Sequence, residues 1–170
     1  MAARQALILL LLSAVCGLGL NLFSPHRIDF VGPYRQLSKG NGPIVPPSAQ
    51  AGDPPFIDIN VAQMEFASGR AVFVDTRDPE EFECGTIPGS INVPFEHLPE
   101  DIDSYYDSVF RDIDKNVVMI LFCSGEECDL SLHLGRNLQD YGYTGLSVFF
   151  GGAREWERFG LEMERRRKCE

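Results

Sequence analysis

The sequence predicts an α/β domain built on a doubly wound parallel sheet and preceded by an N-terminal transmembrane helix. Two observations predict the sheet. Short apolar runs alternate with stretches of helical periodicity from residue 56 onward, and the run at 117–122 contains no polar residue. A strand covered by helices on both faces has this continuous apolar character. A third observation, the 21 uncharged residues at 5–25, predicts the membrane helix.

Residues 1–23 are interpreted as a membrane anchor, with residues 6–23 in contact with the bilayer. About twenty apolar residues are enough to span the hydrocarbon core. Two alternatives stay open: a cleaved signal peptide with its apolar core at 6–12, and a lipid modification of Cys16. Basic residues flank the segment on both sides, so the sequence leaves open which face of the membrane carries the rest of the chain.

Residues 24–55 are interpreted as a tether, because proline and glycine recur throughout them, as in the Gly-Asn-Gly-Pro run at 40–43. So many residues that interrupt secondary structure exclude a helix or a central strand. The folded domain is then expected to cover residues 56–170.

Charge is unevenly distributed along the chain, whose net charge is −10. Residues 1–56 hold four basic and two acidic side chains, a net of +2, which leaves −12 for residues 57–170. A domain this acidic repels the phosphate backbone, so nucleic acid is excluded as a partner. Small molecules and proteins with a basic face remain as candidate partners of the domain.

Apolar runs predict the strands of the domain in chain order. The expected strands, each bounded by polar or turn-forming residues, lie at 71–74, 91–94, 117–122 and 146–150.

Helices are expected between these strands and after the last one, at 79–84, 101–111, 129–140 and 153–159. The first has proline at its first position and acidic residues after it, as a helix N-terminus prefers. Tyr105 and Phe110 are expected to face inward from the helix at 101–111. In the helix at 129–140, leucine recurs every four residues. Trp156 and Phe159 share one face of the fourth.

Cys123 directly follows the apolar run at 117–122 and stands in a short loop that opens a helix. Backbone N–H groups and the helix dipole supply partial positive charge at such a position. This environment lowers the pKa of a thiol and makes the thiolate a nucleophile. Ligands of parallel sheets also bind beyond the carboxyl ends of the strands, where Cys123 and Asp75 both lie.

The five cysteines are an odd number and lack the regular spacing of a disulfide scaffold. No histidine is close enough to them in sequence to suggest a zinc site, and no metal ligands are assigned. Cys84 and Cys169 are interpreted as having no particular role.

Three motifs in the right order resemble the rhodanese domain family. They are D-T-R-D-P-E-E-F at 75–82 with G-T-I-P-G-S-I-N-V-P at 85–94, the six-residue cysteine loop at 123–128, and G-G-A-R-E-W at 151–156 with Gly160. The resemblance covers about residues 56–163. It implies a doubly wound α/β domain and a sulfurtransferase that carries sulfane sulfur as a cysteine persulfide.

Carried over by position, the resemblance implies that Cys123 is the catalytic sulfur carrier and that no metal or organic cofactor is needed. The persulfide would be bound by the amides of the rest of the loop, namely Ser124, Gly125, Glu126, Glu127 and Cys128. Ion pairs among Asp75, Arg77 and Glu81 would order the neighbouring loop, a structural rather than a chemical role.

The loop departs from the family pattern in its charge. Glu126 and Glu127 stand where an anionic donor would approach, and Ser124 replaces a frequent arginine. Carboxylates there repel thiosulfate, so the expected donor is either a persulfidated protein or a small sulfur donor such as a neutral polysulfide. Thr86 for the common histidine and Ser90 for alanine are interpreted as packing changes.

Cys128 is a second departure, and three interpretations stay open. It could resolve a persulfide or sulfenic acid on Cys123 as a redox pair, act as a second sulfur carrier, or be a small apolar residue at a helix start.

A phosphatase with a C-x₅-R loop is excluded, because the sixth residue after Cys123 is Asp129, whose charge has the wrong sign for a phosphate clamp. The expected function is therefore a membrane-tethered, rhodanese-like sulfurtransferase with a thiol acceptor that the sequence does not identify. The alternative is a partner-binding or thiol redox-sensing module that uses Cys123 and Cys128 without turnover.

Overall fold

The computed structural model describes residues 42–169 together with positions 4–6, 10, 13, 17, 19 and 20 of the N-terminal segment. The chain divides into two units, residues 1–36 and 37–170. Most of the predicted anchor at 6–23 and the predicted tether up to residue 41 lie outside the described residues. Among the residues that are described, no helix is long and apolar enough to cross a membrane.

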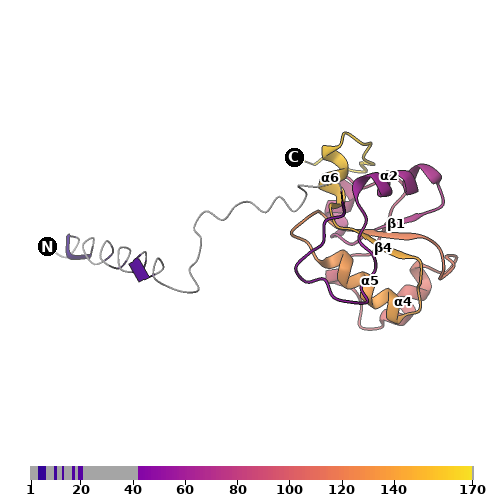
Figure 1. Cartoon of the computed structure of the whole chain (residues 1–170), viewed down its shortest axis with the longest axis horizontal. Helices are drawn as coiled ribbons and strands as arrows, with labels where there is room; N and C mark the ends of the chain where they lie inside the picture. The colour runs from indigo at the N-terminus through magenta and orange to yellow at the C-terminus, as the bar shows by residue number, and fades with distance from the viewer. Residues whose placement is uncertain are drawn as a thin grey trace. The chain divides into compact units, whose positions relative to one another are not determined.

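The domain is a four-stranded parallel sheet with the strand order β2-β1-β3-β4. Its strands are β1 (Val72–Asp75), β2 (Ile91–Asn92), β3 (Met119–Phe122) and β4 (Leu146–Phe149). Its helices are α2 (Ile59–Ser68), α3 (Pro79–Cys84), the 3₁₀ turn η1 (Phe95–His97), α4 (Ile102–Val109), α5 (Leu130–Asp140) and α6 (Gly152–Arg158). Helices α2 and α6 lie on one face of the sheet, and α4 and α5 lie on the other (Figure 1). This is the expected doubly wound arrangement.

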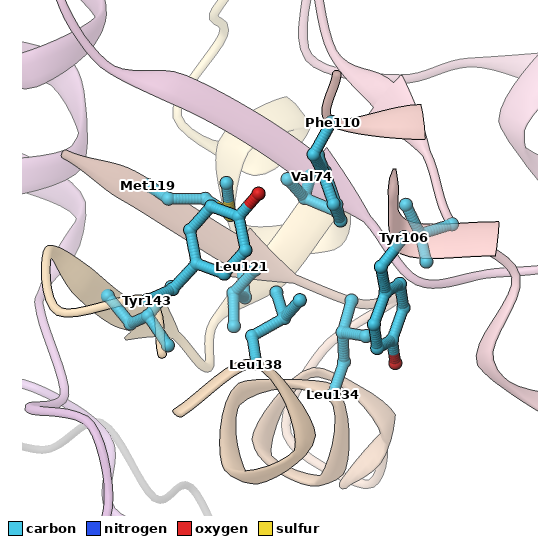
Figure 2. Close-up of a cluster of buried hydrophobic side chains, with 10 residues drawn as sticks. Val74, Tyr106, Phe110, Met119, Leu121, Leu134, Leu138 and Tyr143 are labelled. Atoms are coloured by element: carbon cyan, nitrogen blue, oxygen red, sulfur yellow. The ribbon is translucent and has the colours of Figure 1, made fainter. Parts of the chain in front are cut away.

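The central strand β3 is buried on both faces, as its unbroken apolar sequence predicted. Successive side chains of a strand point to opposite faces. Met119 and Leu121 therefore pack toward α4 and α5, together with Leu134 and Leu138 (Figure 2). Ile120 and Phe122 belong to the opposite cluster, which includes Trp156 of α6.

The predicted elements are present with small shifts of their ends, and four details differ. Strand β3 starts at Met119, and Val118 before it is 40% exposed. On α4, Tyr106 is the deeply buried aromatic residue, while Tyr105 is half-buried. Phe159 lies just past the end of α6 and is exposed, so it does not share the buried face of Trp156. Helix α2 was not predicted.

Residues 42–55 pack on the domain, although the sequence placed them in the tether. Ile44 is buried with Leu132, Val148 and Phe150. The carboxylate of Asp53 accepts two hydrogen bonds from the Arg136 guanidinium, at 2.8 and 2.9 Å. The segment has no regular secondary structure, but its few apolar and charged side chains find partners on α5 and β4. The structure therefore differs from the expected boundary at residue 56.

The chain that follows Pro54 also covers the edge of the sheet. Val148 of β4 donates its N–H to the carbonyl of Pro55, and its own carbonyl accepts from the N–H of Ile57, both at 2.9 Å. These bonds form a parallel bridge between Phe56 and Val148. An open strand edge is a site for unwanted pairing with other chains, and this segment blocks it.

The C-terminal residues are joined to α3 by a disulfide between Cys84 and Cys169, with Cα atoms 5.5 Å apart. Glu164 and Thr86 exchange reciprocal backbone hydrogen bonds of 2.9 and 3.0 Å along the same path. The interpretation of Cys84 and Cys169 as residues without a role was wrong. Their separation of 85 residues hid the pairing, since only the fold brings them together.

The packing of residues 42–55 is tested by a pair of adjacent substitutions. We expect Ile44→Ala to lower the free energy of unfolding by about 2–5 kcal/mol, because it leaves a cavity among buried side chains. Val45→Ala, at a side chain that is 51% exposed, is expected to change it by less than about 0.5 kcal/mol. Urea unfolding of both variants measures the difference. Equal, small effects would mean that the segment is a free tether.

Candidate active site

Cys123 is the first residue after β3, and only 2% of its surface is exposed. The start of α6 holds the backbone of Cys123 and of the residue that follows it. The carbonyl of Cys123 accepts a hydrogen bond from the N–H of Ala153 at 2.9 Å, and that of Ser124 accepts from Arg154 at 3.1 Å. Gly152 makes this approach possible, because its φ is +62° and a Cβ there would collide with the Cys123 carbonyl oxygen.

The loop after Cys123 is a tight turn built around Gly125. This residue is buried with φ +153°, and its carbonyl accepts from the N–H of Cys128 at 2.9 Å. Within residues 42–169, the amides of Ser124, Gly125 and Glu127 donate to no backbone carbonyl. A turn with such amides offers donors to an anion, as the resemblance implied for a persulfide.

Cys123 and Cys128 form a disulfide in this structure, with Cα atoms 6.2 Å apart. That separation lies within the ordinary range for disulfides. The structure thus joins the two cysteines whose relationship the sequence left open, and Cys128 is half-buried rather than part of the core. In the disulfide state neither sulfur is available as a nucleophile, so the site must be reduced before Cys123 can accept a group.

Asp75 and Arg77 form a buried ion pair at the end of β1. The Arg77 guanidinium donates from Nε to Asp75 Oδ1 at 2.9 Å and from Nη2 to Oδ2 at 2.5 Å. Arg77 also donates to the carbonyl of Gly85 at 2.7 Å. Glu81, the third member of the predicted network, lies 4.0 Å from Arg77 and is 54% exposed, so its contribution is small.

Three polar residues complete this network, and sequence reasoning gave them no role in it. Thr86 is fully buried and donates its hydroxyl to Asp75 Oδ2 at 2.8 Å, so it is a hydrogen-bonding partner rather than a packing change. Asn92 donates to the carbonyl of Arg77 at 2.8 Å. Thr76 donates its N–H to the carbonyl of Phe122 at 3.0 Å, which joins the network to the residue before Cys123. All three lie within the motifs at 75–82 and 85–94, and this position was the only sign in the sequence that they belong to the site.

Arg154 is a cation beside the cysteine loop that the charge argument overlooked. Its side chain is exposed and passes Gly125, with Cδ at 3.6 Å from the position a Cβ would occupy there. Glu127 is exposed and Glu126 half-buried. The surroundings of the loop therefore carry both signs of charge.

Glu155 adds a half-buried carboxylate near the loop, and its oxygen lies against Gly151. The pKa of Glu155 is raised, first because burial removes water from the carboxylate and second because the charge of Glu126 is near. Arg158 opposes this shift without cancelling it. Ionised Glu155 is thus a source of electrostatic cost in the fold.

A cleft of about 340 Å³ lies between α3, α6 and the C-terminal residues. Arg154 belongs both to its wall and to the surroundings of the cysteine loop. Arg77, Arg165 and the Cys84 end of the disulfide also line it. In the part of the chain that the structure describes, no group of three or more His, Cys, Asp or Glu side chains is placed to hold a metal ion.

Comparisons with known proteins agree with this geometry. A family model described as the rhodanese-like domain matches residues 59–159. The chain is 31% identical over 110 residues to thiosulfate:glutathione sulfurtransferase from Homo sapiens, which covers 60% of this chain and 92% of that protein.

Solved structures share the fold. A protein from Bacillus halodurans matches with a TM-score of 0.57 and 21% identity, over 67% of this chain and 78% of its own. Thiosulfate sulfurtransferase from Pseudomonas aeruginosa matches with a TM-score of 0.52 and 22% identity, over 68% of this chain and 21% of its own. At these identities the likeness concerns the fold alone.

The structural role of Arg77 is tested by Arg77→Met. We expect the free energy of unfolding to fall by about 3–5 kcal/mol, because the fully buried Asp75 carboxylate loses its ionic partner. Arg70→Met, at an exposed position, is the matched control and should have an effect below about 0.5 kcal/mol. Chemical unfolding at neutral pH compares the two, and similar values would contradict the assigned role.

The cost of ionised Glu155 predicts a pH dependence of stability. A raised folded-state pKa means that the folded protein binds the proton more tightly, so stability falls as pH rises from about 4.5 through the folded pKa. Glu155→Gln removes this loss. We expect urea unfolding to show the variant more stable than wild type at pH 8, with a smaller difference at pH 4. Glu100→Gln, at an exposed site, should show no such trend, and a less stable Glu155→Gln at pH 8 would refute the prediction.

Proposed function

Because this chain belongs to the rhodanese-like domain family, we propose that it is a sulfurtransferase that carries sulfane sulfur as a persulfide on Cys123. The observation that carries the proposal is the position of Cys123. It directly follows the buried strand β3 of a parallel sheet, where ligands of such sheets bind, and it opens a turn with available amides. A reduced Cys123 attacks the outer sulfur of a donor, and the donor's remaining thiolate leaves.

Two features support stabilisation of the persulfide. The amides of Ser124, Gly125 and Glu127 are donors in a turn whose shape is fixed by Gly125 and by the start of α6. Preorganised donors of this kind stabilise charge on sulfur without having to reorient. The buried position of Cys123 Sγ removes competing water, which strengthens each of these interactions.

The proposed donor is a persulfidated protein or a neutral polysulfide. Glu126 and Glu127 disfavour a dianion such as thiosulfate at the loop, while Arg154 offsets part of their charge. The proposed acceptor is a small thiol of the glutathione kind, by analogy with the human relative, whose name includes both thiosulfate and glutathione. No metal or organic cofactor takes part in this proposal.

A single-pass N-terminal anchor at residues 6–23 is part of the same proposal and rests on the apolar sequence alone. We place the domain on the oxidising side of that membrane. The support is the Cys84–Cys169 disulfide, which joins distant parts of the fold, since structural disulfides persist in oxidising compartments and are rare in the cytosol.

The second candidate function is a partner-binding or thiol redox-sensing module without sulfur transfer. The Cys123–Cys128 disulfide favours it, because a sensor needs two cysteines that can pair within the native fold.

The two candidates are separated by a loading experiment on the full chain, purified in detergent and reduced before use. After exposure to polysulfide, we expect peptide mapping to show Cys123 heavier by one sulfur atom, and glutathione added next to become persulfidated. Cys123→Ser should reduce transfer to the uncatalysed rate, and Cys169→Ser should retain it. A chain that never gains sulfur on Cys123, and yields only the Cys123–Cys128 disulfide, would favour the sensor.

A further inference from the structure

We propose that Cys128 resolves the persulfide on Cys123, so that the domain releases its sulfur as sulfide and closes the Cys123–Cys128 disulfide. This inference rests on the proposed function, because it needs the persulfide as its starting point. It adds a second product to that function and a second substrate class, a dithiol reductant.

The first support is that the two sulfurs can bond while the loop keeps its native anchors. In the disulfide state the Cys123 carbonyl accepts a hydrogen bond from the N–H of Ala153, and the N–H of Cys128 donates to the Gly125 carbonyl, each at 2.9 Å. At the C-terminal end of the loop, the carboxylate of Asp129 accepts a hydrogen bond from the Ser48 hydroxyl at 2.7 Å. The Cys123–Cys128 disulfide is therefore compatible with these contacts at both ends of the loop.

The second support is the difference in exposure between the two sulfurs of the persulfide. Cys123 is 2% exposed in this structure, and we infer that a thiol from solution reaches the outer sulfur of the persulfide more readily than Sγ. Attack on the outer sulfur transfers it, whereas attack on Sγ of Cys123 expels it. Cys128 is bonded to Sγ in this structure and is therefore placed for the second reaction.

The third support is proximity. Cys123 and Cys128 are five residues apart in one turn, with Cα atoms 6.2 Å apart. An intramolecular thiol has an effective concentration of about the millimolar level or above, which an external thiol must exceed to compete. The balance between transfer and release then depends on the supply of external acceptor.

The chemistry balances without any further oxidant. The thiolate of Cys128 attacks Sγ of Cys123, the bond between the two cysteine sulfurs forms, and the bond from Sγ to the outer sulfur breaks. The electron pair of that broken bond leaves on the outer sulfur as hydrosulfide, HS⁻. The Cys128 sulfur is oxidised and the outer sulfur is reduced by the same amount. A dithiol then reduces the Cys123–Cys128 disulfide by exchange and becomes a disulfide itself.

The test follows one loading event over time in the full chain, reduced, purified in detergent and mixed with polysulfide. Samples are blocked with iodoacetamide at intervals and mapped by mass, and sulfide is measured in parallel. In wild type we expect the Cys123 persulfide to appear first and then decay, while the disulfide and one further sulfide per chain appear at the same rate. In Cys128→Ser we expect the persulfide to last at least about tenfold longer.

Two controls keep the outcomes distinct. Cys169→Ser removes the other disulfide and should behave as wild type. Thermal unfolding of reduced Cys128→Ser confirms that the variant is folded. A wild-type persulfide as long-lived as that of Cys128→Ser would overturn the inference and leave the proposed sulfurtransferase standing. A disulfide that forms with no preceding persulfide, together with no persulfide on Cys128→Ser, would overturn both.

Discussion

The backbone contact between the start of α6 and the cysteine loop is the constraint on which the site depends. Two hydrogen bonds, from Ala153 to Cys123 and from Arg154 to Ser124, fix where the loop leaves the sheet. They exist only because Gly152 has no side chain and adopts a left-handed conformation. The same contact places Arg154 beside Gly125 and the half-buried Glu155 next to Gly151. The position and the charge surroundings of Cys123 therefore share one origin.

Local patterns were sufficient to predict most of the fold. The apolar run ending at Phe122 and the regular leucines of α5 each reflect burial along one element, which can be read within a few residues. The position of Cys123 followed from the order of strand, loop and helix. Helix α2 escaped prediction because its apolar residues form a weak stripe, with only Ile59 and Ala62 buried.

Contacts between residues that are far apart in the sequence could not be predicted. Nothing within a few residues of Ile44 indicates that it packs with Leu132, Val148 and Phe150. Asp53 is an ordinary loop acid until the fold brings Arg136 to it. Thr86 reads as a small replacement for histidine, and only its distance to the Asp75 carboxylate shows a partner. The relation of Cys123 to Cys128 was left with three interpretations, because Cα separation is a property of the folded loop.

The Cys84–Cys169 bond has a topological consequence. It closes a covalent ring that contains the cysteine loop and strands β2, β3 and β4. A protease that cuts one peptide bond inside this ring opens a gap but releases no fragment, because both pieces stay joined through sulfur. A nicked chain would therefore keep its full mass under non-reducing conditions and separate into two fragments only when a reductant and a denaturant are both present.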